Sequence, residues 1–266
     1  MGLAVAFAFQ VATAGNPEAA DRLVVTGSST LAPLMAEIGR RYEEQHPGVR
    51  IDVQAGGSSR GIHDVREGLA DIGMVSRALE DSEKDLKAVT VALDGIGMIV
   101  HSDNPVKELT EQQIVNIYTG AVTDWGQLGV PPGPISAVGK AEGRATLEIF
   151  LAHFHLTVDR LRVQVVIGDN QQGIKTVAAN PGGIGYVSIG SARYEIDHGA
   201  PLRLLPMSGV AASAENVRAG SYPVARSLLL VTSASPRPAV SAFLAFAQSN
   251  KVLDLVASQY FVAVGE

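Results

Sequence analysis

The chain has 266 residues, of which 46% are hydrophobic and only 18% charged, a composition typical of a soluble protein with a substantial core. Its net charge of −6 argues against a general nucleic-acid-binding surface, which is normally basic. Because the sequence contains no cysteine, disulfides, thiol nucleophiles and iron–sulfur sites are excluded.

The first residues predict an export signal. Residues 2–14 form an apolar run that ends in Ala12-Thr13-Ala14, small residues at the spacing of a signal-peptidase site. The run is too short to span a bilayer, and the basic residues that usually precede such a run are missing, so an ordinary buried helix is the alternative. We expect residues 1–14 to be a signal peptide and the protein to be periplasmic or secreted.

From Leu23 onward, short β-rich runs alternate with amphipathic helices, which is the pattern of an α/β protein. Thr110 and Gln113 form a capping box that predicts a helix around residues 114–118. Leu69 is expected on the buried face of the helix that carries Ile62. Further helices are predicted from apolar spacing at 31–42, 147–154, 239–246 and 252–260. Strands are predicted at 23–25, 50–53, 95–100, 135–139, 163–167, 184–189, 202–205 and 227–231.

Three turns share one design, in which a predicted strand ends in small residues and a helix begins. They are Gly27-Ser28-Ser29-Thr30, Gly57-Ser58-Ser59-Arg60-Gly61 and Gly143-Arg144-Ala145-Thr146. Each exposes the free backbone N–H groups and the positive dipole end of a helix, beside a hydroxyl. Simple helix capping is the alternative for any single turn, whereas three such turns in one chain favour a site for an oxyanion.

A fourth segment, residues 71–77, adds the hydroxyl of Ser76 and the guanidinium of Arg77 after an apolar run. The sequence gives little support for a catalytic or metal-binding site. The six histidines are scattered, and the nucleophile elbow, the P-loop and the His-Glu-x-x-His motif are all missing from the sequence. We therefore predict neither an enzyme nor a metal or cofactor site, and we interpret the charge-rich stretch 80–87 as a solvated helix face.

Four stretches resemble, in this order, the periplasmic phosphate-binding component of the phosphate-specific ABC transporter: TGSSTLAP, GGSSRGIHDVREGLADIGMVSR, LDGIGMIVHSDNPVKELTEQQIVNIYTGAVTDWGQLG and NPGGIGYVSIGSA. The resemblance covers nearly all of residues 23–232. It implies the type II periplasmic-binding-protein fold, with mixed sheets flanked by helices in two lobes that two crossover strands join. Lobe 1 would comprise residues 23–100 and 222–266, lobe 2 residues 101–221, and the crossovers would be 95–100 and 227–231.

The resemblance also implies a function. The protein would capture inorganic phosphate between its lobes and, as a monomer, deliver it to a permease and its ATPase, without binding nucleic acid. The family pattern places phosphate ligands at Ser29, Thr30, Ser58, Ser76, Ala145 and Thr146, with Ser28, Ser59 and Arg77 as further candidates. The alternatives are another oxyanion such as arsenate or sulfate, phosphate sensing or scavenging without transport, and, less favoured, a phosphatase.

Two positions depart from the family pattern. The third loop usually reads Gly-Ser-Gly-Thr, so Arg144 replaces a serine ligand. We expect Arg144 to point inward as the counter-charge, together with Lys140, a solvent-facing side chain being the alternative. Some members also place an aspartate near Ser76 to accept the proton of hydrogen phosphate, which disfavours sulfate. Asp94 is the candidate substitute here, and a structural cap is the alternative role for it.

Overall fold

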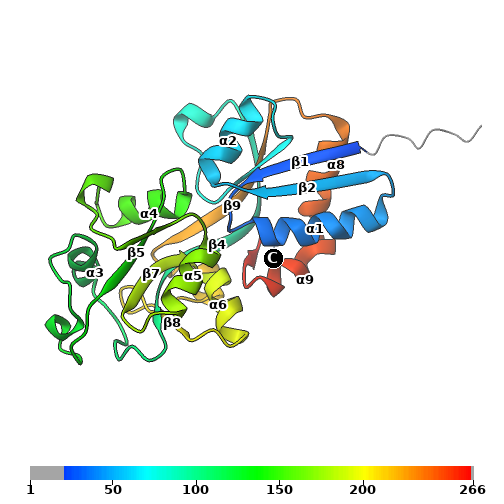
Figure 1. Cartoon of the computed structure of the whole chain (residues 1–266). Coiled ribbons are helices and arrows are strands. Elements are labelled where there is room, and N and C mark those ends of the chain that lie inside the picture. Colours follow the sequence, from blue (N-terminus) through cyan, green and yellow to red (C-terminus); the bar gives the residue numbers. More distant parts are fainter. Residues whose placement is uncertain (1–20, 265–266) are drawn as a thin grey trace, which may run out of the picture.

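A computed structural model describes residues 21–264, so the predicted signal peptide, 1–14, lies outside the described residues. Its strands form two β-sheets that share one long strand, β4 (Lys87–His101) (Figure 1). The first sheet also contains β1 (Asp21–Gly27), β2 (Val49–Ala55), β3 (Ile72–Val75), β9 (Ala225–Thr232) and β10 (Val262–Ala263). The second contains β5 (Ser136–Lys140), β6 (Val165–Ile167), β7 (Gly183–Ser188) and β8 (Leu202–Leu205).

Two neighbouring segments carry the chain from one sheet to the other. β4 pairs with β9 up to Gly95 and with β7 from Ile96 onward, so the first predicted crossover, 95–100, lies within β4. The second predicted crossover, 227–231, lies wholly inside the first sheet as part of β9. The crossing takes place just before β9, where the carbonyl of Val224 accepts a hydrogen bond from the Ile96 N–H at 3.0 Å.

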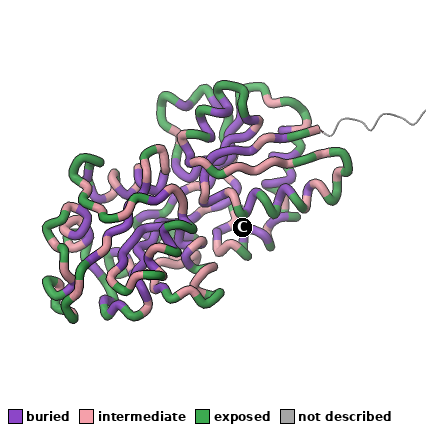
Figure 2. Tube along the Cα trace, in the orientation of Figure 1, coloured by how far each residue is buried: buried purple, intermediate pink, exposed green. Residues whose placement is uncertain are grey.

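Helices cover the faces of both sheets and enclose a core on each of them (Figures 1 and 2). The core of the first sheet includes Leu23, Ile38 and Phe243, and that of the second is centred on Phe150, whose ring stacks on Tyr186 at 3.9 Å. Among residues 21–264, no helix is long and apolar enough to cross a membrane. The helices are α1 (Ala32–Gln45), α2 (Ser58–Arg66), α3 (Glu111–Tyr118), α4 (Ala145–His153), α5 (Asn170–Ala178), α6 (Ile189–Asp197), α7 (Ala214–Arg218), α8 (Pro238–Ala247) and α9 (Leu253–Ser258).

The capping box before α3 is confirmed, since Thr110 Oγ1 accepts from the Gln113 N–H at 3.2 Å and Gln113 Oε1 accepts from the Thr110 N–H at 2.8 Å. Two local predictions are wrong. The stretch 80–87 is a single 3₁₀ turn followed by the start of β4, and Glu83 within it is buried. Leu69 is 64% exposed, because α2 ends at Arg66 before it.

Candidate functional site

Five strands bring the chain to one cavity between the two sheets. β1, β2 and β3 run parallel in the first sheet, and β5 and β6 run parallel in the second. Parallel strands place their carboxyl ends at the same edge of a sheet, where the segments that follow them gather and ligands characteristically bind. The cavity is lined by Ser28, Ser29, Thr30, Gly57, Ser58, Ser76, Lys140, Arg144, Ala145, Thr146 and Gly168.

The cavity is small and its walls are close together. It offers about 10 Å³ to the centre of a water-sized sphere, so only a small ligand fits. Gly57, just before α2, has a φ of +99°, and a Cβ there would lie 2.6 Å from the carbonyl oxygen of Gly143, on the other wall. This close approach of two backbones requires a glycine, and it brings the first turns of α2 and α4 to opposite sides of the cavity.

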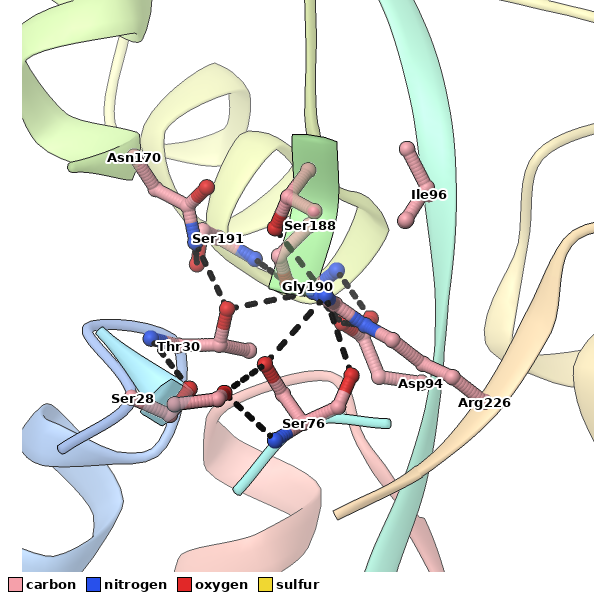
Figure 3. Close-up of polar contacts among 12 residues, drawn as sticks. Ser28, Thr30, Ser76, Asp94, Ile96, Asn170, Ser188, Gly190, Ser191 and Arg226 are labelled. Atoms are coloured by element: carbon pink, nitrogen blue, oxygen red, sulfur yellow. Dashed lines mark hydrogen bonds and ion pairs between the residues drawn. The ribbon is translucent and has the colours of Figure 1, made fainter. Parts of the chain in front are cut away.

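Behind the cavity lies a buried ion pair between Arg226, at the start of β9, and Asp94, on β4. Arg226 Nη2 lies 2.8 Å from Asp94 Oδ2, and both side chains are 1% exposed. The remaining N–H groups of Arg226 donate to hydroxyls from both sides of the cavity, to Thr30 Oγ1 at 3.1 Å (Figure 3) and to Thr146 Oγ1 at 3.0 Å. The ion pair therefore fixes the lining hydroxyls, while Asp94 compensates the charge of the guanidinium.

The hydrogen bonds of these hydroxyls decide what they offer a ligand. Thr30 Oγ1 accepts from Arg226 and, at 2.9 Å, from Asn170 Nδ2 (Figure 3). Its two lone pairs are thereby used, so its hydrogen is left to donate into the cavity. Ser58 Oγ likewise accepts from the Ser76 N–H at 3.1 Å. This part of the wall is arranged to donate hydrogen bonds to an anion.

Two cationic side chains line the wall that the second sheet provides. Lys140, at the end of β5, is buried and donates from Nζ to Asn170 Oδ1 at 3.0 Å. Burial, followed by the charge of nearby Arg226, lowers the pKa of Lys140 to about 7. Arg144 precedes α4 and extends across to Gly57; within residues 21–264 its guanidinium has no hydrogen-bond or ion-pair partner. A bound anion would supply that partner.

The structure brings nine of the expected site residues together at the cavity: Ser28, Ser29, Thr30, Ser58, Ser76, Lys140, Arg144, Ala145 and Thr146. Arg144 thus takes the inward position that was expected. Three other candidates, Ser59, Arg77 and Asp94, do not line it.

These three side chains have partners elsewhere. Ser59 Oγ donates to Glu148 Oε1 at 3.2 Å, and Arg77 forms ion pairs with Glu83 at 2.7 Å and Glu148 at 2.6 Å. Asp94 accepts from Arg226 and from the backbone N–H of Gly190 at 3.2 Å. Asp94 is therefore turned away from the cavity, where an acceptor for a ligand's proton would have to lie.

Sequence reasoning missed three residues at or behind the cavity: Gly168, Asn170 and Arg226. One signal was available for Arg226. Asp94 and Arg226 carry opposite charges, and each stands directly before one of two apolar predicted strands. β4 and β9 pair antiparallel with Asp94 opposite Arg226, a register that the two opposite charges favour.

Residues 12–251 of the chain match the model of the PBP superfamily domain. The fold and the site are therefore those of a solute-binding protein of this superfamily, a class of binding proteins and not of enzymes.

Similar proteins of known name identify the family within this superfamily. The phosphate-binding protein PstS of Bacillus subtilis is 30% identical over 216 residues, which cover 79% of this chain and 69% of that protein. PstS of Pseudomonas aeruginosa is 29% identical, over 90% of this chain and 76% of that protein. The chain belongs to the PstS family of phosphate-binding proteins.

Solved structures agree with this placement. A putative phosphate ABC transporter substrate-binding protein from Clostridium perfringens, solved with bound phosphate, has a TM-score of 0.85 at 32% identity and covers 92% of this chain and 100% of its own. An ABC-type phosphate transport receptor from Vibrio cholerae has a TM-score of 0.73 at 27% identity, with coverage of 91% and 100%.

Proposed function

We propose that this chain captures inorganic phosphate in the cavity between its lobes, outside the cytoplasm, and delivers it to an ABC permease and its ATPase. The observation that carries the proposal is the set of donors at the cavity. Hydroxyls fixed as donors, the first turns of two helices and two cationic side chains converge on one small space. An oxyanion with several acceptor oxygens satisfies all of them at once.

The contacts to phosphate follow from the two walls. Ser29, Thr30, Ser58 and Ser76 bind it from the first lobe through hydroxyls and backbone N–H groups. Arg144, Ala145 and Thr146 bind it from the second lobe. Arg144 supplies the strongest single contact, because its guanidinium is charged and otherwise unpaired among the described residues.

Capture works by closure of two lobes, residues 23–100 with 222–266 and residues 101–221. The two segments that join the lobes lie side by side where the Ile96 N–H donates to the Val224 carbonyl. We take these two segments as the hinge. The protein acts as a monomer that meets the membrane only through the permease. It has no catalytic role, because Thr30 and Ser58 accept hydrogen bonds from the protein and none of the residues that line the cavity is a carboxylate that could activate a hydroxyl.

The experiment is a calorimetric titration of the phosphate-stripped protein with phosphate, arsenate and sulfate. Saturable binding of one phosphate per chain supports the proposal, and no phosphate signal contradicts it. Delivery is tested separately, by phosphate-dependent stimulation of ATP hydrolysis when the protein is added to its permease–ATPase in proteoliposomes. Phosphate binding without stimulation would assign the chain a sensing or scavenging role.

Sulfate is the second candidate ligand, and one observation favours it. None of the residues that line the cavity is a carboxylate. A wall without a carboxylate suits an oxyanion without a proton, and hydrogen phosphate carries one.

A further inference from the structure

The cavity poses a problem of selectivity. Hydrogen phosphate needs one acceptor for its O–H group, whereas sulfate needs none. None of the residues that line the cavity is a carboxylate, and Asp94 and Glu148 are already paired, with Arg226 at 2.8 Å and with Arg77 at 2.6 Å. A group of another kind must therefore accept the proton if the site prefers phosphate.

The lining hydroxyls do not provide this preference. Thr30 Oγ1 accepts two hydrogen bonds from the protein, at 2.9 Å and 3.1 Å, and so presents its hydrogen to the ligand. Ser58 Oγ accepts one, at 3.1 Å, and keeps a second lone pair, so it can donate to either anion or accept from hydrogen phosphate. The Ser29 hydroxyl also lines the cavity. It can rotate to accept from hydrogen phosphate or to donate to sulfate, so it serves either anion.

Lys140 is different, because its amine loses its acceptor capacity when it takes up a proton. Nζ is fixed by Asn170 Oδ1 at 3.0 Å, and the side chain is buried at the cavity wall. As a neutral amine Nζ has one lone pair and two hydrogens. As an ammonium it has three hydrogens and only donates.

The charges around Lys140 favour the neutral form. Arg226 faces it from β9 and Arg144 from the start of α4, while Asp169, just before α5, is the opposing negative charge. The phenol oxygen of Tyr186, on β7, accepts from the Lys140 backbone N–H at 3.3 Å. Burial, then Arg226, lowers the pKa of the Lys140 amine to about 7, so near neutral pH both protonation states are populated.

We propose that Lys140 decides between hydrogen phosphate and sulfate, with its neutral amine as the acceptor of the phosphate proton. This inference rests on the phosphate-capture function proposed above. When the hydrogen-phosphate dianion binds, its O–H donates to the lone pair of Nζ, one amine hydrogen stays on Asn170 Oδ1, and the other is free for a phosphate oxygen. No proton is exchanged with solvent.

Sulfate brings no proton, so it is held best by the charged ammonium. Above the pKa of the free amine, sulfate binding must therefore take up one proton from solvent. One proton per bound ligand lowers the sulfate affinity about tenfold for each pH unit, while the phosphate affinity stays level. The selectivity for phosphate over sulfate rises by the same factor.

The test is calorimetry with phosphate, arsenate and sulfate at several values between about pH 7.5 and 9, where free phosphate is mainly the hydrogen-phosphate dianion. Each titration is repeated in two buffers of different ionisation enthalpy, which counts the protons taken up. We expect about one proton with sulfate, close to none with phosphate, and a ratio of affinities that rises about tenfold per pH unit. Arsenate, which also carries a proton here, should follow phosphate.

Two variants isolate the amine. Lys140→Arg keeps a permanent charge, so its phosphate-to-sulfate ratio should be low and independent of pH. Lys140→Met removes both the charge and the lone pair. It should weaken the binding of both ligands, and the ratio of their affinities should not change with pH. Lys107→Met, a substitution at an exposed residue far along the chain from the cavity loops, should behave as the wild type.

The proton count needs only the wild-type protein, so the inference remains testable if a Lys140 variant does not fold. The inference is overturned if the ratio of phosphate to sulfate affinity in the wild type does not change with pH. It is also overturned if that ratio still rises with pH in Lys140→Met. Sulfate that fails to bind even at about pH 6 also overturns it, because the charged site should then accept sulfate. Absence of phosphate binding at every pH is a different result and contradicts the proposed function itself.

Discussion

The two walls of the cavity are built on the same plan but carry different chemistry. The wall from the first sheet is neutral and consists of Ser28, Ser29, Thr30, Gly57, Ser58 and Ser76. The wall from the second sheet carries the charge, in Lys140 and Arg144, together with Ala145, Thr146 and Gly168. Both follow parallel strands into helix first turns, so the difference lies in the side chains and not in the fold.

This difference separates two tasks. The charged wall attracts any small anion, because Coulomb forces depend little on its shape. The neutral wall selects by geometry, because each donor needs an oxygen at hydrogen-bonding distance. Arg226 comes from the first sheet, and Asp94 compensates its charge. Its role is therefore to orient hydroxyls of both walls through hydrogen bonds.

The largest effect is expected from removing Arg226, which joins the two walls. Arg226→Met leaves Asp94 buried without its counter-charge and should cost about 3–5 kcal/mol of unfolding free energy. The double variant with Asp94→Asn should regain most of that stability, because the uncompensated charge is gone and the amide oxygen still accepts from Gly190. Urea unfolding measures both.

Phosphate affinity should stay low in that double variant, because Thr30 and Thr146 have lost the donor that orients them. Wild-type affinity there would show that the ion pair contributes only stability. If the Arg226→Met single variant kept the unfolding free energy of the wild type, burial of Asp94 would not depend on its ion pair with Arg226.

Removing the charge of the second wall should be the next largest effect. Arg144→Ala should weaken phosphate binding about 10- to 150-fold, since a hydrogen bond to a charged group contributes about 1.5–3 kcal/mol. Stability should change little, because the guanidinium has no partner within the described residues. Calorimetry measures the affinity, and Arg160→Ala, at an exposed position, is the matched control. Equal affinity in Arg144→Ala and wild type would place Arg144 outside the site.

A buried hydroxyl on the neutral wall should have an intermediate effect. Thr30→Val removes one donor to phosphate and leaves Arg226 and Asn170 short of an acceptor, so we expect about tenfold weaker binding and about 1–3 kcal/mol less stability. Thr26→Val is the matched control. Thr26 is equally buried, its Oγ1 has no hydrogen-bond partner among residues 21–264, and it does not line the cavity, so stability should hold or rise. Similar losses in both variants would refute a specific role for the Thr30 hydroxyl.

The sequence predicted the neutral wall better than its surroundings. Local patterns identified the turns at Ser28–Thr30 and Ser58, because a strand end, a glycine and a helix start are short-range signals. The strands of both sheets were also found from their apolar runs, apart from β3 and β10. Arg226 was missed, because its role depends on pairing with a residue 132 positions away. The stretch around Glu83 was misassigned because the burial of Glu83 depends on its ion pair with Arg77, which the charge pattern of the stretch does not reveal.

The smallest effect is expected outside the cavity, where one carboxylate connects its two walls. Glu148, on α4 beside the second sheet, accepts from Ser59 Oγ at 3.2 Å and Arg77 Nε at 2.6 Å, both from segments that follow strands of the first sheet. Because Glu148 is a third exposed, the contact should contribute only about 0.2–1 kcal/mol to closure.

Glu148→Gln should therefore weaken phosphate binding by no more than about fivefold, mainly through faster release, since loss of the ion pair destabilises only the closed form. Stopped-flow measurement of the association and release rates checks this, and the effect should shrink in high salt. Glu108→Gln, at an exposed residue away from both lobes' contact, is the matched control. A slower association with unchanged release would instead mean that Glu148 acts before closure, on the entry of the anion past the charged wall.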